Sequence, residues 1–83
     1  MKTAKQPAYT LFGTSACHLC EVAQEMIESL CEENPQLNYE KVDISDSETL
    51  FALYGIRIPV LRNAAGRELG WPFSPAQLRE FMV

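Results

Sequence analysis

Two cysteines separated by two residues carry the clearest chemical signal in the sequence. Cys17 and Cys20 follow an apolar segment and a Gly-containing turn, and they open an amphipathic helix. Residues three apart on a helix lie on one face with Cβ atoms about 5–6 Å apart, close enough for a disulfide after a small rearrangement. A sulfur in the first helical turn also meets unpaired backbone N–H groups and the positive end of the helix dipole, which favour thiolate over thiol. This arrangement predicts a redox-active dithiol in which Cys17 is the nucleophile and Cys20 the resolving thiol.

The composition is that of one small globular domain. Of 83 residues, 47% are hydrophobic and 22% are charged, which is typical of folded domains rather than of disordered or membrane proteins. Residues 1–7 are mostly polar and end in a proline, so we expect a flexible leader followed by a single domain over residues 8–83. No apolar run approaches the roughly 18 residues of a transmembrane helix, and none follows the leader as an export signal. We therefore expect a cytoplasmic protein that does not associate with membranes.

Charge and cysteine count restrict the partners and the compartment. Seven Lys and Arg against eleven Asp and Glu give a net charge of −4 without a basic cluster, so nucleic acid is not an expected partner. A CxxC pair with one further free cysteine fits a reducing compartment. That third cysteine, Cys31, lies about 16 Å beyond Cys20 if both are on one helix, too far for a disulfide. It falls on the apolar face, and we expect it in the core.

Hydrophobic periodicity predicts the elements that position the dithiol. Residues 8–12 combine aromatic and β-branched side chains and predict a strand that ends at Gly13. Residues 37–44 alternate apolar and polar side chains and predict a second strand, parallel to the first. Between them, residues 18–33 predict an amphipathic helix whose apolar positions recur every three or four residues, at Leu19, Val22, Ala23, Met26, Ile27 and Leu30.

The second half of the chain predicts a short helix, two strands and a last helix. Ser45 and Glu48 offer a capping box for the short helix, which Gly55 closes. The two strands are joined by a turn of Asn, Ala and Gly, and the last helix carries a Ser cap followed by Pro. We expect the first of these strands at residues 56–62 and the turn at 63–66. The antiparallel partner strand is expected at 67–71, and Ser74 is the expected cap.

This order of elements resembles the thioredoxin fold in its minimal glutaredoxin-like form, over essentially all of the chain after residue 7. Residues 12–20 (FGTSACHLC) are similar to the glutaredoxin strand, turn and CxxC, and residues 54–60 (YGIRIPV) are similar to the loop that carries the cis-proline of this superfamily. The resemblance implies an α/β fold of order β-α-β-α-β-β-α, with a four-stranded mixed sheet flanked by helices. It also implies that the Ile58-Pro59 bond is cis and lies against the dithiol.

The same resemblance implies a thiol–disulfide oxidoreductase, and some positions depart from the glutaredoxin pattern. His18-Leu19 stands where glutaredoxins commonly carry Pro-Tyr, and Thr14 stands where they tend to place a Lys or Arg. Gly70-Trp71-Pro72 lies near the place of a Gly-Gly pair followed by Asp. The residues that hold glutathione are thus not all present, so we expect no required cofactor, with glutathione as an alternative. Thr14, Arg57 and Trp71 are the candidates for substrate contacts, although Arg57 also suits a solvated strand end and Trp71 the core.

The expected partners are a protein or low-molecular-weight disulfide as substrate, and a reductase or glutathione as electron source. Two other interpretations stay open. The fold could be a non-catalytic binding module that docks a peptide beside Pro59, or Cys17 with external thiols could bridge a metal or iron–sulfur cluster between two chains. We expect a monomer without a metal site, because one chain does not offer the four ligands of structural zinc. His18 could assist Cys17 when protonated, or lie exposed.

Overall fold

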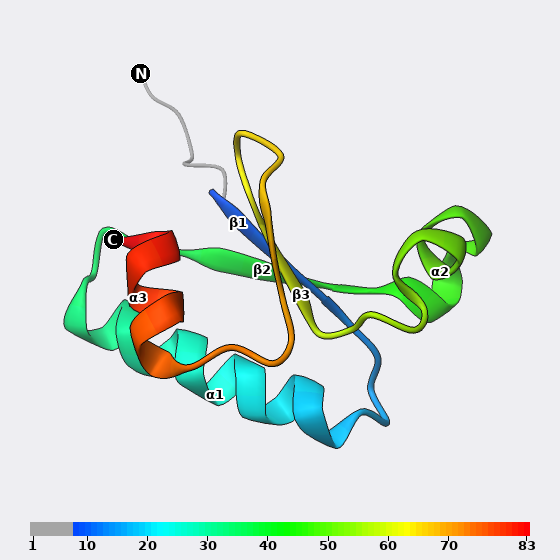
Figure 1. Ribbon diagram of the computed structural model, residues 1–83, viewed down its shortest axis with the longest axis horizontal. Helices are drawn as coiled ribbons and strands as arrows, with labels where there is room; N and C mark the ends of the chain where they lie inside the picture. Colours follow the sequence, from blue (N-terminus) through cyan, green and yellow to red (C-terminus); the bar gives the residue numbers. More distant parts are fainter. Residues whose placement is uncertain (1–7) are drawn as a thin grey trace.

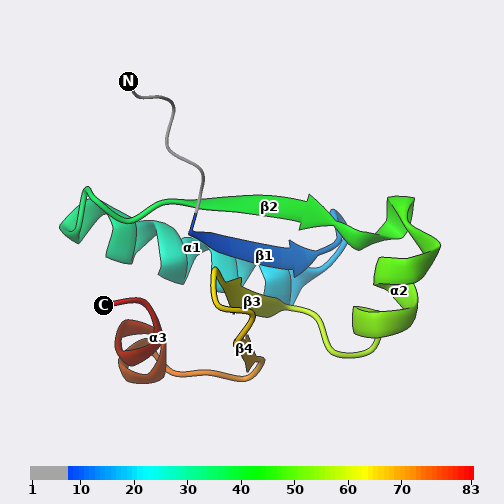
Figure 2. The ribbon, with the colours of Figure 1, turned by 90° about the horizontal axis from the view of Figure 1, so that it is seen from above.

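The computed structural model describes residues 8–83, so the leader expected at residues 1–7 lies outside the described residues. Four strands form one sheet, whose spatial order β2-β1-β3-β4 can be followed in Figure 2. None of the helices in residues 8–83 is long and apolar enough to cross a membrane. The strands are β1 (Tyr9–Gly13), β2 (Tyr39–Asp43), β3 (Val60–Asn63) and β4 (Glu68–Gly70).

The sheet is mixed, as expected. β1 and β2 are parallel and are connected by the helix α1 (His18–Glu33), which confirms the predicted β-α-β unit. β3 runs antiparallel to β1, with Val60 opposite Phe12, and β4 runs antiparallel to β3. Parallel strands need a long crossover whereas antiparallel strands can be joined by a tight turn. The long connection through α1 therefore allows β1 and β2 to be parallel, and the short turn between β3 and β4 makes those two strands antiparallel.

Each face of the sheet is covered by different helices. Leu11 and Leu61 point to one face and pack with α1 and with α3 (Pro75–Met82). Phe12, which follows Leu11, and Val60, which precedes Leu61, point to the other face. They pack with Tyr54 of α2 (Glu48–Tyr54). Figure 1 shows α1 and α3 close together, with α2 at the opposite end of the molecule. Because successive strand residues face opposite sides, a short buried strand supplies both cores.

Helix α1 has the predicted bounds but not all of the predicted apolar face. Its buried side chains are Cys20, Ala23, Ile27 and Leu30. Leu19, expected among the inward residues, is 45% exposed, because it lies about 100° around the helix from Cys20, which is buried in its place. The helix ends at Asn34, whose backbone N–H donates to the carbonyls of Leu30 and Cys31.

The capping box expected between Ser45 and Glu48 is wrong. Ile44–Asp46 forms a 3-10 turn instead, because the Asp43 carboxylate accepts the N–H of Ser45 at 2.9 Å and its hydroxyl at 2.6 Å. The N-cap of α2 is Ser47, whose hydroxyl accepts the N–H of Leu50. Gly55 ends this helix as predicted, although its φ of −51° is ordinary helical geometry. An aspartate one turn earlier thus decides which serine caps the helix.

The strand predicted over residues 56–62 begins only at Val60. The carbonyl of Tyr54 accepts the N–H groups of Arg57 and Ile58, so the chain after α2 turns back instead of extending. The predicted turn after β3 is confirmed, with the Asn63 side chain accepting backbone N–H groups and Gly66 at a φ of 88°. The last strand is shorter than the predicted residues 67–71.

The cap predicted for the last helix is confirmed in full. The Ser74 hydroxyl accepts the N–H of Gln77, and the Gln77 side chain accepts the N–H of Ser74. Pro75 occupies the first helical turn, where a missing N–H has no cost. This reciprocal pair fixes the start of the helix that delivers Leu78 and Met82 to the core.

We expect Ser74→Ala to lower the free energy of unfolding by about 1 kcal/mol, the usual loss for an N-cap serine. Urea denaturation followed by far-UV circular dichroism measures it. Ser29→Ala on the exposed surface of α1 is the control, and it should leave stability unchanged or slightly raised because Ala favours helix. Equal stability of the two variants would contradict the assigned cap.

Candidate active site

Cys17 and Cys20 form a disulfide, with their Cα atoms 5.2 Å apart. This confirms the proximity predicted from their spacing. Cys17 is the N-cap of α1 rather than a residue of its first turn, with extended backbone at φ −100° and ψ 110°. The two sulfurs differ in surroundings, since Cys17 is half-buried whereas Cys20 is only 7% exposed.

The Cys17 sulfur lies where the backbone of α1 can act on it. The N–H of Cys20 donates to the Cys17 Sγ at 3.1 Å, as an N-cap side chain usually receives a free N–H of the first turn. Four such N–H groups and the positive end of the dipole gather at a helix start. In the reduced protein the same position favours negative charge on the Cys17 sulfur.

Gly13, the last residue of β1, makes room for the Cys20 sulfur. A Cβ on Gly13 would stand 2.8 Å from the Cys20 Sγ and 3.1 Å from its Cβ. The sequence interpretation gave Gly13 only the role of ending a strand, yet the residue pairs with Asp43 within the sheet. The sequence does offer one indication of this role. A glycine in a buried strand often marks a place where another group approaches the backbone closely.

The Ile58-Pro59 bond is cis, as the resemblance implied. Since Phe12 pairs with Val60, the turn that follows β1 and the loop that precedes β3 lie at the same end of two neighbouring strands. Figures 1 and 2 both show them there. Pro59 is buried, its carbonyl accepts the N–H of Trp71, and the N–H of Ile58 donates to Tyr54. Among residues 8–83, no backbone group donates to the Ile58 carbonyl.

The two residues between the cysteines lie at the surface. The His18 side chain is 83% exposed, and its Nδ1 lies 3.8 Å from Glu21 Oε1 on the next turn. Of the two placements considered for His18, the exposed one is observed. Leu19 is also exposed, so the CxxC presents one basic and one apolar side chain to solvent.

The three candidates for substrate contacts have different surroundings. Thr14 lines a pocket of about 280 Å³ beside Cys20, together with residues of β2 and of the first turns of α1. Trp71 packs edge-on against Phe73, with ring centroids 5.0 Å apart, next to the core. Arg57 lies on the surface between α2 and β4, where it pairs with Glu68. Trp71 thus takes the core role considered for it.

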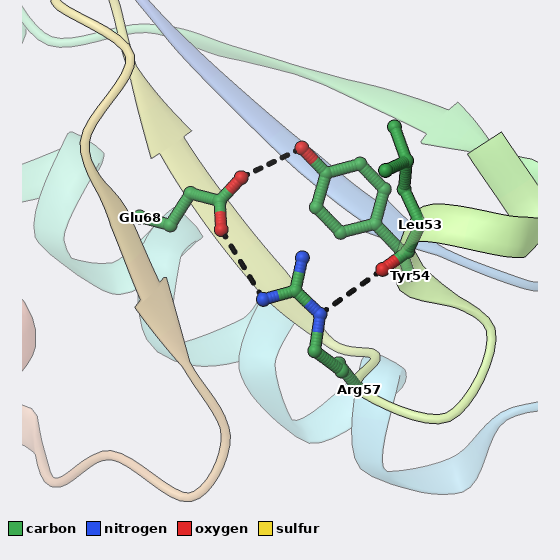
Figure 3. A network of polar contacts seen from close by, with 4 residues as sticks. All are labelled: Leu53, Tyr54, Arg57 and Glu68. Atoms are coloured by element: carbon green, nitrogen blue, oxygen red, sulfur yellow. Dashed lines mark hydrogen bonds and ion pairs between the residues drawn. The ribbon is translucent and has the colours of Figure 1, made fainter. Parts of the chain in front are cut away.

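Sequence reasoning missed the partners of Arg57. The Glu68 carboxylate accepts a hydrogen bond from the Tyr54 hydroxyl at 2.7 Å and lies 3.4 Å from Arg57 Nη1 (Figure 3). Burial, followed by this bond to Glu68, raises the pKa of Tyr54, so its hydroxyl stays protonated and donates. These residues are 11 and 14 positions from Glu68, too distant for a local pattern to show the contact.

Cys31 is the free thiol of the described residues and stands apart from the dithiol. It is half-buried rather than fully buried, and it packs against the core between α1 and the sheet. Burial, followed by the negative charge of Glu28, raises the pKa of the Cys31 thiol. Within residues 8–83 no three His, Cys, Asp or Glu side chains stand close enough together to hold a metal ion.

Comparison with known structures and families places this geometry in a wider group. The X-ray structure of protein XcR50 from X. campestris is 39% identical, with a TM-score of 0.76 over 89% of this chain and 93% of that one. Protein Ne2328 from Nitrosomonas europaea is 24% identical, with a TM-score of 0.76 over 100% of both chains. A mutant thioredoxin from Halobacterium salinarum is 22% identical, with a TM-score of 0.66 over 89% of this chain and 69% of that one.

These likenesses confirm the expected α/β thioredoxin-like fold. A comparison with curated proteins finds no match. Residues 9–82 match the family described as glutaredoxin-like domain (DUF836), a range that includes the disulfide, the cis-proline and all of the helices and strands described above. The chain therefore belongs to the glutaredoxin-like domain family of the thioredoxin superfamily.

Proposed function

We propose that the protein is a small thiol–disulfide oxidoreductase in which Cys17 is the nucleophile and Cys20 the resolving thiol. The observation that carries the proposal is the Cys17–Cys20 disulfide at the start of α1, beside the loop with the cis Ile58-Pro59 bond. A disulfide between residues one helical turn apart can open and close without moving the rest of the fold. The alternative of a binding module gives the two sulfurs no role.

The reaction proceeds by two exchanges. The Cys17 thiolate attacks one sulfur of a substrate disulfide, whose S–S bond breaks; the departing thiolate takes a proton from water and a mixed disulfide remains on Cys17. Cys20, deprotonated in turn, attacks the Cys17 sulfur and releases the second substrate thiol. The substrate gains two electrons, and the protein is left with the Cys17–Cys20 disulfide. A second reductant then reopens this bond.

The unequal exposure of the sulfurs supports this division of roles. An incoming disulfide reaches the half-buried Cys17 from solvent, whereas Cys20 packs against Gly13 and is nearly buried. The bond from the Cys20 N–H to the Cys17 sulfur supports the same assignment, because it stabilises charge on the attacking atom. His18 lies at the surface, with its Nδ1 3.8 Å from Glu21 Oε1, and assistance to Cys17 by a protonated His18 stays a prediction.

Protein or low-molecular-weight disulfides are the proposed substrates, and a reductase or glutathione the proposed electron source. No bound cofactor is required, because both electrons reside on the two sulfurs. We propose a monomer that acts in electron transport in the cytoplasm, where a dithiol can be kept reduced. Comparing thioredoxin reductase and NADPH with glutathione and glutathione reductase identifies the electron source.

We expect Cys17→Ser to abolish reduction of 2-hydroxyethyl disulfide, because no other cysteine of residues 8–83 offers an accessible sulfur at the start of α1. Cys20→Ser should retain the first exchange and accumulate a mixed disulfide on Cys17, seen by mass spectrometry as the mass of half the substrate. Cys31→Ala is the matched control and should keep full activity. Activity of Cys17→Ser comparable to that of the control would refute the assignment.

Alkylation of the reduced protein with iodoacetamide at pH 7 should modify Cys17 faster than Cys31. A raised pKa lowers the thiolate fraction of Cys31, and each unit of pKa slows its reaction about tenfold at this pH. Raising the pH should therefore speed Cys31 more than Cys17. Peptide mass spectrometry over a time course measures the three rates, and the same measurement in about 8 M urea should make them alike. Equal rates in the folded protein would contradict the proposed nucleophile.

A further inference from the structure

Arg57, on the loop that borders the proposed active site, forms an ion pair with Glu68 of β4. We call Tyr54, Arg57 and Glu68 the Glu68 cluster (Figure 3). Both Glu68 oxygens are used, one by the Tyr54 hydroxyl at 2.7 Å and the other by Arg57 Nη1 at 3.4 Å. Arg57 Nε donates to the carbonyl of Leu53 at 3.1 Å, and the guanidinium lies 4.9 Å from the centre of the Tyr54 ring.

The cluster adjoins the backbone of the cis-proline loop. Arg57 immediately precedes Ile58-Pro59, and the N–H groups of Arg57 and Ile58 both donate to the carbonyl of Tyr54. The side chains of Arg57 and Glu68 are 49% and 31% exposed, so solvent and small solutes reach them. A cation thus stands on the segment where a substrate is proposed to dock, already paired with a carboxylate of the same chain.

Two other cations of residues 8–83, Lys41 and Arg62, lie near the site, and neither forms an ion pair with a carboxylate. Lys41, which lines the pocket beside Cys20, donates to the side chain of Gln24 at 3.1 Å and shares that pocket with Asp43. Arg62 lies 5.5 Å from the centre of the Phe12 ring and faces Glu68 across the β3–β4 pair. Glu68 therefore lies between two arginines. It forms its ion pair with Arg57, which directly precedes Ile58-Pro59 in the sequence.

We propose, building on the proposed oxidoreductase function, that Glu68 determines specificity by occupying Arg57 and so disfavours disulfides that carry a carboxylate. Such a substrate is disfavoured because Glu68 already offsets the charge of the guanidinium and, at 3.4 Å from Arg57 Nη1, repels a second carboxylate that approaches it. A neutral disulfide has nothing to gain from Arg57 and is unaffected. Specificity then arises from an internal competitor and not from the shape of the site.

Glu68→Gln tests the proposal, since the amide still accepts the Tyr54 hydroxyl but no longer carries charge. The two substrates are 3,3′-dithiodipropionate, which carries a carboxylate on each arm, and the neutral 2-hydroxyethyl disulfide. We expect kcat/KM for the anionic substrate, relative to the neutral one, to rise about three- to five-fold, the range of a partly exposed ion pair. The change should lie in KM, because the carboxylate pairs equally in the bound and transition states.

Two variants separate pairing with Arg57 from general effects. Glu32→Gln, at an exposed position of α1, removes the same charge from the net −4 without touching the cluster, and it should leave the ratio unchanged. Adding Arg57→Gln to Glu68→Gln should abolish the gain. An unchanged ratio in Glu68→Gln, an equal rise in Glu32→Gln, or an equal loss with both substrates would overturn the proposal.

A binding measurement keeps this inference distinct from the proposed function. The oxidised protein is titrated with 3-(methylthio)propanoate, an unreactive thioether with the same carboxylate arm, and the Arg57 Nε–Hε resonance is followed by NMR. Glu68→Gln should bind it about three- to five-fold more tightly than the unchanged protein, whether or not either protein reduces disulfides. Equal affinity would refute the role of Glu68, whereas tighter binding without turnover would refute only the oxidoreductase assignment.

Discussion

The pairing of β1 with β3 is the constraint on which the proposed active site depends. With Phe12 opposite Val60, the turn leading to Cys17 and the loop ending in Pro59 come from adjacent ends of the two strands. A shift of one residue would turn the side chains of one strand to the opposite faces, so that each core would receive a side chain of the wrong shape from that strand. Burial on both faces therefore fixes the register, and the register in turn places the turn before the disulfide and the proline loop at the same end of the sheet. The geometry of the site is a consequence of core packing.

Elements decided by local chemistry could be predicted from the sequence, and those decided by distant groups could not. Helix α1 and the cap at Ser74 follow from spacing and side-chain type alone. Ser45 carries the same local signal as a cap, but the carboxylate of Asp43 binds it first. The strand expected from residue 56 is interrupted because the Tyr54 carbonyl captures the next N–H groups. In both cases one acceptor group that takes two hydrogen bonds outweighs a weak local preference.

The candidate site divides in the same way. The dithiol spacing and the resemblance together predicted the disulfide and the cis-proline, because each involves no more than four consecutive residues. Gly13 was assigned only a turn, since its role depends on where the Cys20 sulfur packs. Glu68 was not identified at all, because a glutamate on a short exposed strand is common and only the fold brings it to Arg57.

Tyr54 connects the core to the site by three different parts of one residue. Its ring is buried and stacks on Phe12, with centroids 4.3 Å apart, so the end of α2 is held against β1 by apolar contact. Its hydroxyl reaches Glu68 on β4, and its carbonyl receives the N–H groups that shape the cis-proline loop. A displacement of the ring would therefore move the loop and the ion pair together. In so small a domain, the interactions that stabilise the second core also hold in place the backbone of the cis-proline loop.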